Sequence, residues 1–364
     1  MHEQVKPRIT VVIPFYVAEP ADAPGRYQGT LGPWSGAPAA GDAGRTRERH
    51  LHLMLSSLAA QTLPIDEFEV LVVDDGSASD VQRCVEDWRL NLRLRVIRQR
   101  HSGFCTAYNT GIEQARAPVV FLAVDHDILS PGTLAAHLAR HAAEGTEAAV
   151  SGRQRYLFHS IIFNDLTDPS AGLADLSQLA MLPDLGWLPA AVRNLDLDRK
   201  PVTVDDVLHR FDTVAVLASC TQEYADVEAV LRADLANKLR CGWLAMRTGS
   251  NSVATSALRA VGGFDSQLDA HFGWYAEHDL GLRLFQSGVP FRFAEEAMAI
   301  DLFHGPPATA GIGKSTALAY LIGKHNTVDV ALLPHYVDRV LDIEEYSHHA
   351  AAAQRWWPSN GEIR

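Results

Sequence analysis

Short apolar runs alternate with helical patterns through the first half of the chain, and this alternation constrains the fold more than any other feature. The apolar runs, rich in β-branched residues, occupy 8–16, 69–73, 93–98 and 118–124. The helical patterns cover about 47–61, 79–90, 104–116 and 131–143. Short apolar runs bounded by turn residues are typical of strands buried on both faces. Their alternation with helices predicts βαβ units, and hence an α/β fold with a mostly parallel central sheet flanked by helices.

Composition narrows the class of protein further. The chain has 364 residues, 47% apolar and 21% charged, which is enough for a large core and excludes a disordered chain. It carries 32 Lys and Arg against 44 Asp and Glu, and the net charge of −12 argues against a generic nucleic-acid surface. Apolar runs such as 119–124 are far shorter than the roughly 20 residues that cross a bilayer.

The cellular location is predicted from two further features. The first residues show no signal-peptide pattern. The four cysteines are widely spaced and form no CxxC motif, which indicates reduced thiols. We therefore expect a cytoplasmic protein with no transmembrane segment and no nucleic-acid partner.

Two stretches interrupt the alternation of strands and helices. Residues 18–46 are rich in Ala, Gly and Pro, which predicts a loop insertion. Residues 156–245 show mostly helical patterns and few strand signals, which predicts a mainly helical insertion beside the sheet.

Acidic residues follow the second predicted strand, in Asp74-Asp75-Gly76-Ser77. Ligands of parallel sheets bind at the carboxyl ends of the strands. Adjacent buried acids are costly unless something pairs with them. Capping of the next helix by Asp75-Gly76-Ser77 is one interpretation, but it leaves Asp74 unexplained.

The fourth predicted strand ends in Asp125-His126-Asp127. Carboxylates at i and i+2 leave a strand on the same side, whereas His126 is expected to point to the opposite face. Two such carboxylates can share Mg²⁺ or Mn²⁺, which also bind phosphate oxygens.

Small residues at Gly103, Ala107 and Gly111 recur on one face of the helical pattern at 104–116. Close packing of this helix on the sheet explains their spacing. Asn109, in the same pattern, could bond either to a loop or to a ligand. His137 and His141 lie one turn apart on another predicted helix, where we expect a solvated face.

Five ordered motifs together resemble a known family. They are IPFY at 13–16, VDDGS at 73–77, the helix motif at 103–111, DHD at 125–127 and the pair GGFD at 262–265 with WYAEHDLGLRL at 274–284. This series is similar to the family-2 inverting glycosyltransferases of the GT-A fold, a Rossmann-like architecture. The resemblance covers roughly residues 8–304, apart from the two insertions.

The resemblance implies roles for individual residues. Pro14 and Tyr16 would line the base pocket, Asp75 with Asp74 would hold uracil or ribose, and Asp125 would face the ribose and diphosphate. Gly103 and Asn109 join this donor-binding set. Asp127 would ligate the metal together with His304, for which an ordinary strand-end histidine is the alternative.

The predicted acceptor-site helix departs from the family pattern. Aligned through Leu280 and Arg283, the catalytic base falls on Glu277, and Asp279 takes the second acidic position. A shift of one residue would exchange these roles. Both acids could instead merely stabilise a helix N-terminus.

The resemblance implies a metal-dependent inverting glycosyltransferase that uses Mn²⁺ or Mg²⁺ and moves a sugar from a nucleoside diphosphate donor, most simply a UDP-sugar, to a hydroxyl or amine. The acceptor would be a small molecule, peptide or glycan, with a lipid-linked acceptor as an alternative. A sugar nucleotidyltransferase and a catalytically degenerate sugar-nucleotide-binding protein are the rival functions.

Four segments follow from these motifs. Residues 1–155 would bind the nucleotide sugar, 156–245 form the helical insertion, 246–310 bind the acceptor, and 311–364 form a lid and a helical tail. Lys314 in Gly311-Ile312-Gly313-Lys314-Ser315 could reach a phosphate from that lid. The pair Trp356-Trp357 predicts either a homodimer contact or a helix that completes the fold.

Overall fold

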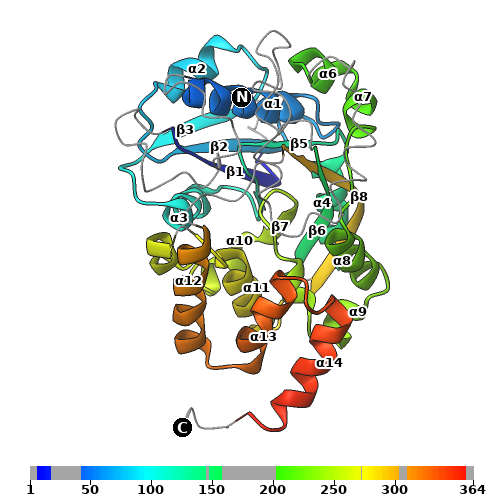
Figure 1. The fold of residues 1–364 in the computed structure, drawn as a ribbon. Helices are drawn as coiled ribbons and strands as arrows, with labels where there is room; N and C mark the ends of the chain where they lie inside the picture. Colours follow the sequence, from blue (N-terminus) through cyan, green and yellow to red (C-terminus); the bar gives the residue numbers. More distant parts are fainter. Residues whose placement is uncertain are drawn as a thin grey trace, which may run out of the picture.

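The computed structural model describes residues 6–17, 42–144, 147–157, 202–271, 273–302 and 310–357. Within them, eight strands form one sheet in the order β3-β2-β1-β4-β7-β6-β8-β5 (Figure 1). The strands are β1 (Ile9–Phe15), β2 (Phe68–Asp74), β3 (Leu94–Arg98), β4 (Val119–Leu122), β5 (Asp127–Leu129), β6 (Ala149–Tyr156), β7 (Asn251–Ala254) and β8 (Phe291–Asp301). The four predicted strands are β1 to β4, and the α/β fold is confirmed.

The first four strands form the parallel part of the sheet. β2 and β4 flank β1 in parallel, and β3 continues the same direction beyond β2. The remaining part is mixed: β7 is antiparallel to both β4 and β6, β8 is parallel to β6, and β5 is antiparallel to β8. Strands from before residue 157 and after residue 250 therefore interleave in one sheet.

Helices cover both faces of the parallel strands. Ile9, Val11 and Ile13 pack with α1 (Asp42–Ala59), whereas Val12 joins the cluster of α3 (Phe104–Gln114). Successive side chains of a strand point to opposite faces, so a strand covered on both sides is apolar throughout. This is why the unbroken apolar run of β1 is compatible only with a central position.

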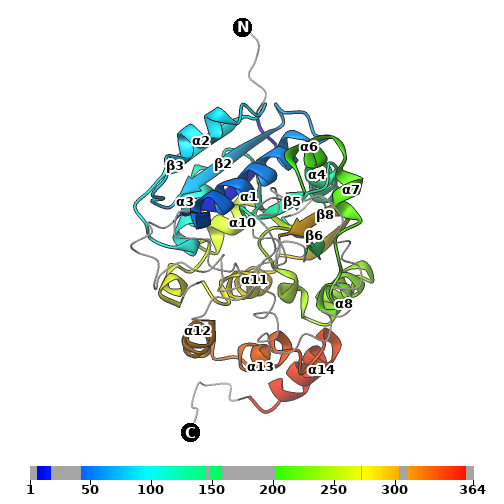
Figure 2. The same ribbon diagram turned by 45° about the horizontal axis from the view of Figure 1, so that its top comes forward.

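The other helices lie mostly around the second half of the sheet. They are α2 (Val81–Asp87), α4 (Thr133–Glu144), α6 (Val204–His209), α7 (Phe211–Ala215), α8 (Gln222–Arg232), α9 (Leu235–Lys238), α10 (Thr255–Ala260), α11 (Ala276–Gln286), α12 (Ala310–His325), α13 (Val328–Val337) and α14 (Ile343–Gln354), with 3₁₀ turns η5 (Gly242–Ala245) and η6 (Ser266–His271). Figures 1 and 2 place α12 to α14 at the end of the molecule away from α1 and α2.

Parts of the predicted insertions lie outside the described residues, namely 18–41 and 158–201. The described part of the second insertion, 202–245, contains α6 to α9 and η5. The glycine-rich segment at 311–315 belongs to α12, and Lys314 forms an ion pair with Asp338 near the end of α13. The segment that the sequence predicts as a lid therefore begins with a helix, and its Lys314 contacts Asp338.

Two surface features complete the description. Trp356 is 88% exposed beyond α14, whereas the indole nitrogen of Trp357 donates a hydrogen bond to the carbonyl of Asn326. Among the described helices, none has both the length and the apolar character that crossing a membrane requires.

Candidate active site

A pocket opens at the carboxyl ends of β1, β2 and β4. It is lined by Pro14, Phe15, Tyr16, Arg47, Asp75, Phe104, Ala107, Tyr108, Val124, Asp125 and His126. The ring of Tyr16 stacks on that of His101, with centroids 4.1 Å apart. The parallel strands thus bring Pro14, Tyr16, Asp75 and Asp125 to one place, as ligand sites in open α/β sheets require.

Asp75 is held by the loop that follows β3. Its carboxylate accepts hydrogen bonds from the backbone N–H groups of Ser102 and Gly103, each at 2.9 Å, and from the side-chain amide of Gln99 at 2.7 Å. Gly103 has φ +116°, and a Cβ there would lie 2.4 Å from the carboxyl carbon of Asp269. Gly103 therefore shapes the loop that orients Asp75.

Asp74 serves the turn after β2 rather than the pocket. Its carboxylate accepts from the backbone N–H of Ser77 at 2.8 Å and from Arg98 at 3.1 Å, and it lies outside the pocket lining. The next helix, α2, is capped by Asp80. The interpretation that Asp75-Gly76-Ser77 caps that helix is therefore wrong. Asp74, which that interpretation did not explain, is the residue that closes the turn.

Asn109 bonds to a loop. Its side-chain nitrogen donates to the carbonyl of Phe264, and its side-chain oxygen accepts from the N–H of Phe264, both at 2.8 Å. Gly263 packs so closely that a Cβ would lie 2.3 Å from that oxygen. Both polar atoms of the Asn109 side chain therefore join α3 to the GGFD segment. Asn109 has a structural contact where the sequence predicts a contact with the donor.

Asp125 forms a buried ion pair with Arg47 of α1. The Nε of Arg47 lies 3.1 Å from one carboxylate oxygen, and the Nδ1 of His126 lies 3.0 Å from the other. Burial alone would raise the pKa of Asp125, but Arg47 and His126 outweigh it and lower that pKa. Nothing in the spacing of the sequence singles out Arg47.

Asp127 begins β5 and lies directly opposite Asp301, the last residue of β8, in the antiparallel pair. Asp127 is fully buried, and neither of its carboxylate oxygens has a hydrogen-bond partner among the described residues. Gly249 passes close by, with φ +96°, and a Cβ there would lie 2.0 Å from one of these oxygens. Only a glycine leaves room for Asp127 in this position.

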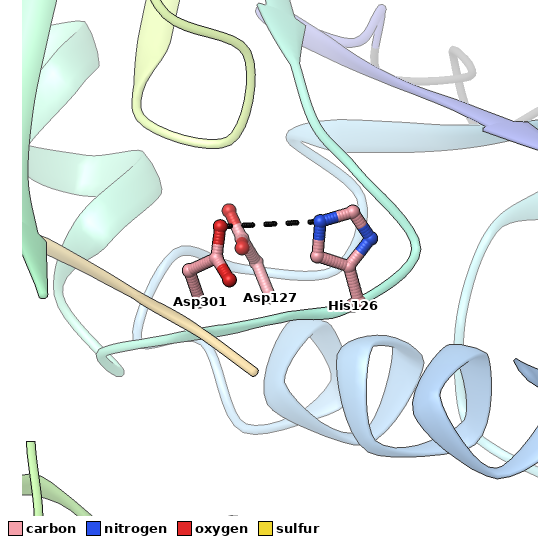
Figure 3. Close-up of side chains that lie close together, drawn as sticks. All are labelled: His126, Asp127 and Asp301. Carbon is pink, nitrogen blue, oxygen red and sulfur yellow. Dashed lines mark ion pairs between the residues drawn. The ribbon is translucent and has the colours of Figure 1, made fainter. Parts of the chain in front are cut away.

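His126, Asp127 and Asp301 form a cluster in which one ligand atom from each lies within 4.8 Å of the others (Figure 3). The Nε2 of His126 is 3.9 Å from Asp301. The expectation that His126 points away from the acids is wrong, because β4 ends at Leu122 and strand alternation does not extend through the connection to β5. Sequence reasoning misses Asp301, although an acid at the end of a strand is the same signal that marks Asp125.

The charges of this cluster perturb one another. Burial and the charge of Asp301 raise the pKa of Asp127. Burial opposes protonation of His126, but the hydrogen bond to Asp125 and the nearby acids raise its pKa to about 9. The charge of a protonated His126 offsets one of the two buried carboxylates, and the other requires a proton or a cation. The carboxylate oxygens of Asp127 and Asp301, with the imidazole of His126, are a ligand set that fits Mn²⁺ or Mg²⁺. The predicted ligand His304 lies outside the described residues.

Glu277 lies in the first turn of α11, partly exposed. One of its oxygens, Oε1, accepts hydrogen bonds from both the backbone N–H and the hydroxyl of Thr248, the first at 2.5 Å. Burial raises the pKa of both Asp127 and Asp301, and the charge of Glu277 adds to both shifts, so Glu277 lies within electrostatic range of the cluster.

Asp279 is buried in an ion network that joins α11 to α12. Its carboxylate oxygens accept from Arg283 at 2.8 Å, Lys324 at 2.6 Å and His325 at 2.7 Å. Burial opposes its charge, but His325, Arg283 and Lys324 together lower the pKa of Asp279 to about 2. A carboxylate so acidic and so fully bonded is a poor general base.

The α/β fold and the carboxylates at the strand ends agree with the resemblance that the sequence motifs indicate. Residues 46–164 match the model of the family described as glycosyl transferase family 2. This part of the chain, which holds β2 to β6, is thus similar to that family.

Relatives named for glycosyl transfer are similar over most of the chain. Validoxylamine A glucosyltransferase from Streptomyces hygroscopicus subsp. jinggangensis is 26% identical over 69% of this chain and 51% of its own length. Hyaluronan synthase from Pasteurella multocida is 25% identical over 76% of this chain and 25% of its own. The crystal structure of S. aureus TarS 1–349 in complex with UDP-GlcNAc has a TM-score of 0.46 and 14% identity, and the match covers 82% of this chain and 60% of that chain. The chain thus spans about half or less of the length of these two curated relatives.

Proposed function

We propose that this protein transfers a sugar from a nucleoside diphosphate sugar, most simply a UDP-sugar, to an acceptor hydroxyl or amine, with inversion at the anomeric carbon and with Mn²⁺ or Mg²⁺. The observation that carries the proposal is the buried carboxylate of Asp127, which has no hydrogen-bond partner within the described part of the chain. It lies beside His126, which also lines the strand-end pocket, and within the electrostatic reach of Glu277. In this proposal the strand-end pocket would hold the nucleoside, the acidic cluster would hold the ion, and Glu277 would act as the base.

The donor would bind with its base in the pocket at Tyr16. The stacked pair of Tyr16 and His101 supplies an aromatic wall for a planar base, since stacked aromatic rings are a favourable arrangement. The carboxylate of Asp75, which the loop around Ser102 and Gly103 holds in the lining of this pocket, would accept an N–H from uracil.

The leaving diphosphate would lie next to the acidic cluster. When bound at Asp127 with His126 and Asp301, or with the predicted ligand His304, Mn²⁺ or Mg²⁺ would offset the negative charge that the diphosphate gains as the glycosidic bond breaks. Arg47 keeps Asp125 ionised and fixed beside the same pocket. This chain's own contribution is to hold the acids and the nucleoside in one rigid geometry.

Glu277 is the proposed general base. Thr248 holds its Oε1, which leaves Oε2 to take the proton of an acceptor hydroxyl as that oxygen attacks the anomeric carbon. In a single displacement with inversion, the base lies on the side of the sugar opposite the leaving group. Asp279 is engaged with α12 and keeps a structural role.

The names of relatives support hexosyl transfer as the reaction class. They include a glucosyltransferase and, at 34% identity over 89 residues, the poly(ribitol-phosphate) β-N-acetylglucosaminyltransferase TarS of Staphylococcus aureus strain Mu50. We extend only the class to this chain, with a small-molecule, peptide or glycan acceptor.

The test is UDP release from UDP-glucose and UDP-N-acetylglucosamine with Mn²⁺, over a broad acceptor panel. We expect turnover by the wild type, loss of turnover with retained UDP binding in Glu277→Gln, and loss of turnover in Asp127→Asn. Glu295→Gln, an exposed acid on β8, is the matched control and should behave as the wild type. UDP binding without turnover by the wild type would favour a degenerate binding protein, and pyrophosphate release from UTP plus a sugar phosphate would favour a nucleotidyltransferase.

A further inference from the structure

The loop at 247–250, between η5 and β7, contacts both the candidate base and the acidic cluster. Thr248 anchors Oε1 of Glu277 by two hydrogen bonds. The next residue, Gly249, passes so close to Asp127 that a Cβ would lie 2.0 Å from a carboxylate oxygen. The position of this loop therefore sets the candidate base relative to the cluster, and the contacts that hold the loop control that geometry.

Arg247, the first residue of this loop, joins it to two helices. Its Nη2 donates to Glu223 of α8 at 2.8 Å, and its Nη1 donates to Nε2 of His278 of α11 at 2.9 Å. Nη1 also donates to the carbonyls of Leu244 and Met246, at 3.3 and 3.0 Å. The side chain of Arg247 is only 16% exposed. Because a guanidinium donates in several fixed directions at once, it can hold α8, α11 and η5 in one arrangement.

His278 supplies the contact to α11. It follows Glu277 in the first turn of that helix and is buried. Burial and the charge of Arg247 lower the pKa of His278 well below its usual value, so the ring is neutral and its Nε2 accepts the N–H of Arg247. Arg247 therefore acts on the candidate base from two sides: it is bonded to Thr248 through the backbone, and it holds the residue next to Glu277.

Glu223 is shared between two arginines. Besides Arg247, it accepts from Arg339, just after α13, at 2.7 Å. Burial opposes the charge of Arg247, but nearby groups, Glu223 first among them, raise its pKa. The charge of Glu277 contributes to the same shift, so the guanidinium lies within electrostatic range of the candidate base. The two ion pairs thus connect α8, which belongs to the described segment 202–245, and the end of α13 to the loop that directs Glu277.

We propose that Arg247 is a positioning residue for the candidate base, and that α8 acts on the base through it. The inference rests on the proposed function for the role of Glu277, and it extends that function by giving a helix of the predicted insertion a part in catalysis. Without the guanidinium, the loop and α11 could move independently, and Oε2 of Glu277 would lose its direction.

The first test is Arg247→Met, which replaces the guanidinium by an uncharged side chain. Urea unfolding, calorimetric UDP binding and steady-state UDP release with Mn²⁺ are measured on the full chain. The folded variant should bind UDP as the wild type does, because the pocket at Tyr16 contains none of these residues. Its kcat should fall roughly a hundredfold, as a misplacement of about 1 Å can cost. Arg247→Lys should recover only part of this loss, since one ammonium cannot span Glu223 and His278.

Two substitutions of His278 separate positioning from stability. In His278→Gln the side-chain oxygen can accept the N–H of Arg247, whereas in His278→Leu nothing can. We expect His278→Gln to keep a kcat near that of the wild type, and His278→Leu to lose roughly tenfold or more. A merely structural role would lower the stability of these variants and leave kcat of the folded protein unchanged.

The part of α8 is tested through Glu223. Glu223→Gln should lower kcat while leaving UDP affinity unchanged, because the guanidinium loses its charged partner. If α8 acts through Arg247, the double variant Arg247→Met/Glu223→Gln should be no slower than Arg247→Met alone.

Arg155→Met is the matched control. The side chain of Arg155, on β6, is also 16% exposed and pairs with Glu228 of the same helix α8. Its other hydrogen bond goes to the carbonyl of Gln154 rather than to the loop or to α11. This variant should unfold at a lower urea concentration than the wild type and keep the wild-type kcat.

Three results would overturn the inference: a wild-type kcat in folded Arg247→Met, equal kcat values in His278→Gln and His278→Leu, or a further tenfold loss in the double variant. Failure of the proposed function has a different signature, since the wild type would then release no UDP with any acceptor. A double-mutant cycle of Arg247→Met and Thr248→Val in urea unfolding decides the inference in that case. Coupled effects would support one rigid unit of Arg247 and the Thr248 anchor, and additive effects would overturn it.

Discussion

Thr248 and Glu277 are joined by two hydrogen bonds that end on the same carboxylate oxygen. The backbone N–H and the hydroxyl of Thr248 both donate to Oε1 of Glu277, and no residue in the described part of the chain donates to Oε2. One oxygen is therefore anchored, and the other is available for proton transfer. The loop before β7 thus sets the direction in which the candidate base points.

Removal of the Thr248 hydroxyl should weaken catalysis but not donor binding. In Thr248→Val the backbone hydrogen bond stays, but the carboxylate regains rotational freedom, and we expect kcat to fall roughly tenfold to a hundredfold. Steady-state UDP release and calorimetric UDP binding measure the two effects. Thr255→Val removes a buried hydroxyl bonded to Ala117 and should leave kcat unchanged. Equal kcat in the Thr248 variant and the wild type would contradict the anchoring role.

Asp279→Asn should lower stability rather than remove the chemistry. The variant leaves Arg283, Lys324 and His325 without their shared anion, and loss of one partner from a buried ion network costs about 3–5 kcal/mol. Urea unfolding at pH 7 gives the free energy of unfolding, and UDP binding reports the intact pocket. A folded variant of wild-type stability that has lost turnover would instead make Asp279 the base.

The same carboxylate has a defined pH dependence. Its pKa is about 2 in the folded protein against 3.8 in the unfolded chain, so the unfolded chain binds the proton first as pH falls. The contribution of Asp279 is complete above pH 3.8 and is lost as pH falls through about 2. The difference in the free energy of unfolding between the wild type and Asp279→Asn should therefore shrink only in this acidic range. Unfolding followed by circular dichroism at a series of pH values measures this difference.

Arg47→Leu should strongly destabilise the protein because it leaves Asp125 buried with only His126 as a partner. We expect a loss of about 3–5 kcal/mol in the free energy of unfolding. Most of this loss should return in the double variant Arg47→Leu/Asp125→Asn, since the uncompensated charge is then gone. Urea denaturation of the two single variants and the double variant gives the coupling energy, and additive effects would show that the ion pair contributes nothing.

His137 makes stability depend on pH near neutrality. It is fully buried beside Ser252, and burial together with the charge of His141 lowers the pKa of His137 to about 3. The unfolded chain takes up this proton near pH 6.5 and the folded protein does not, so stability should fall as pH drops from about 6.5 toward 3.

The slope of the free energy of unfolding against pH separates the contribution of His137 from that of other groups. One proton corresponds to about 1.4 kcal/mol per pH unit, and His137→Asn should reduce the slope by up to this amount. His209→Asn, on the exposed side of α6, should leave the slope unchanged. Unfolding midpoints between about pH 4.5 and 7 check both, and an unchanged slope in His137→Asn would mean that this histidine is charged when buried. The position also corrects the expected solvated face, because the spacing of His137 and His141 cannot show that β7 packs against them.

Local sequence patterns determined the strands and the pocket that they form. The apolar runs at β1, β2 and β4 are short and continuous, so they fit only central parallel strands, and the carboxyl ends of such strands meet at one edge. Pro14, Tyr16, Asp75 and Asp125 can therefore be placed together from strand order alone. Residue type showed that Asp74 and Asn109 needed polar partners, but not that these partners are Ser77 with Arg98 and the backbone of Phe264.

The tertiary structure alone decided which distant groups share one electrostatic environment. Asp301 faces Asp127 only because β8 pairs with β5. Asp279 is a poor candidate for the general base only because α12 places Lys324 and His325 within hydrogen-bond distance of its carboxylate. The chain by itself determines local propensity and strand-end chemistry, since these depend on neighbours a few residues apart. Whether a carboxylate is neutralised, anchored or left to bind a cation depends on pairings between residues far apart in the chain, and these are set by packing.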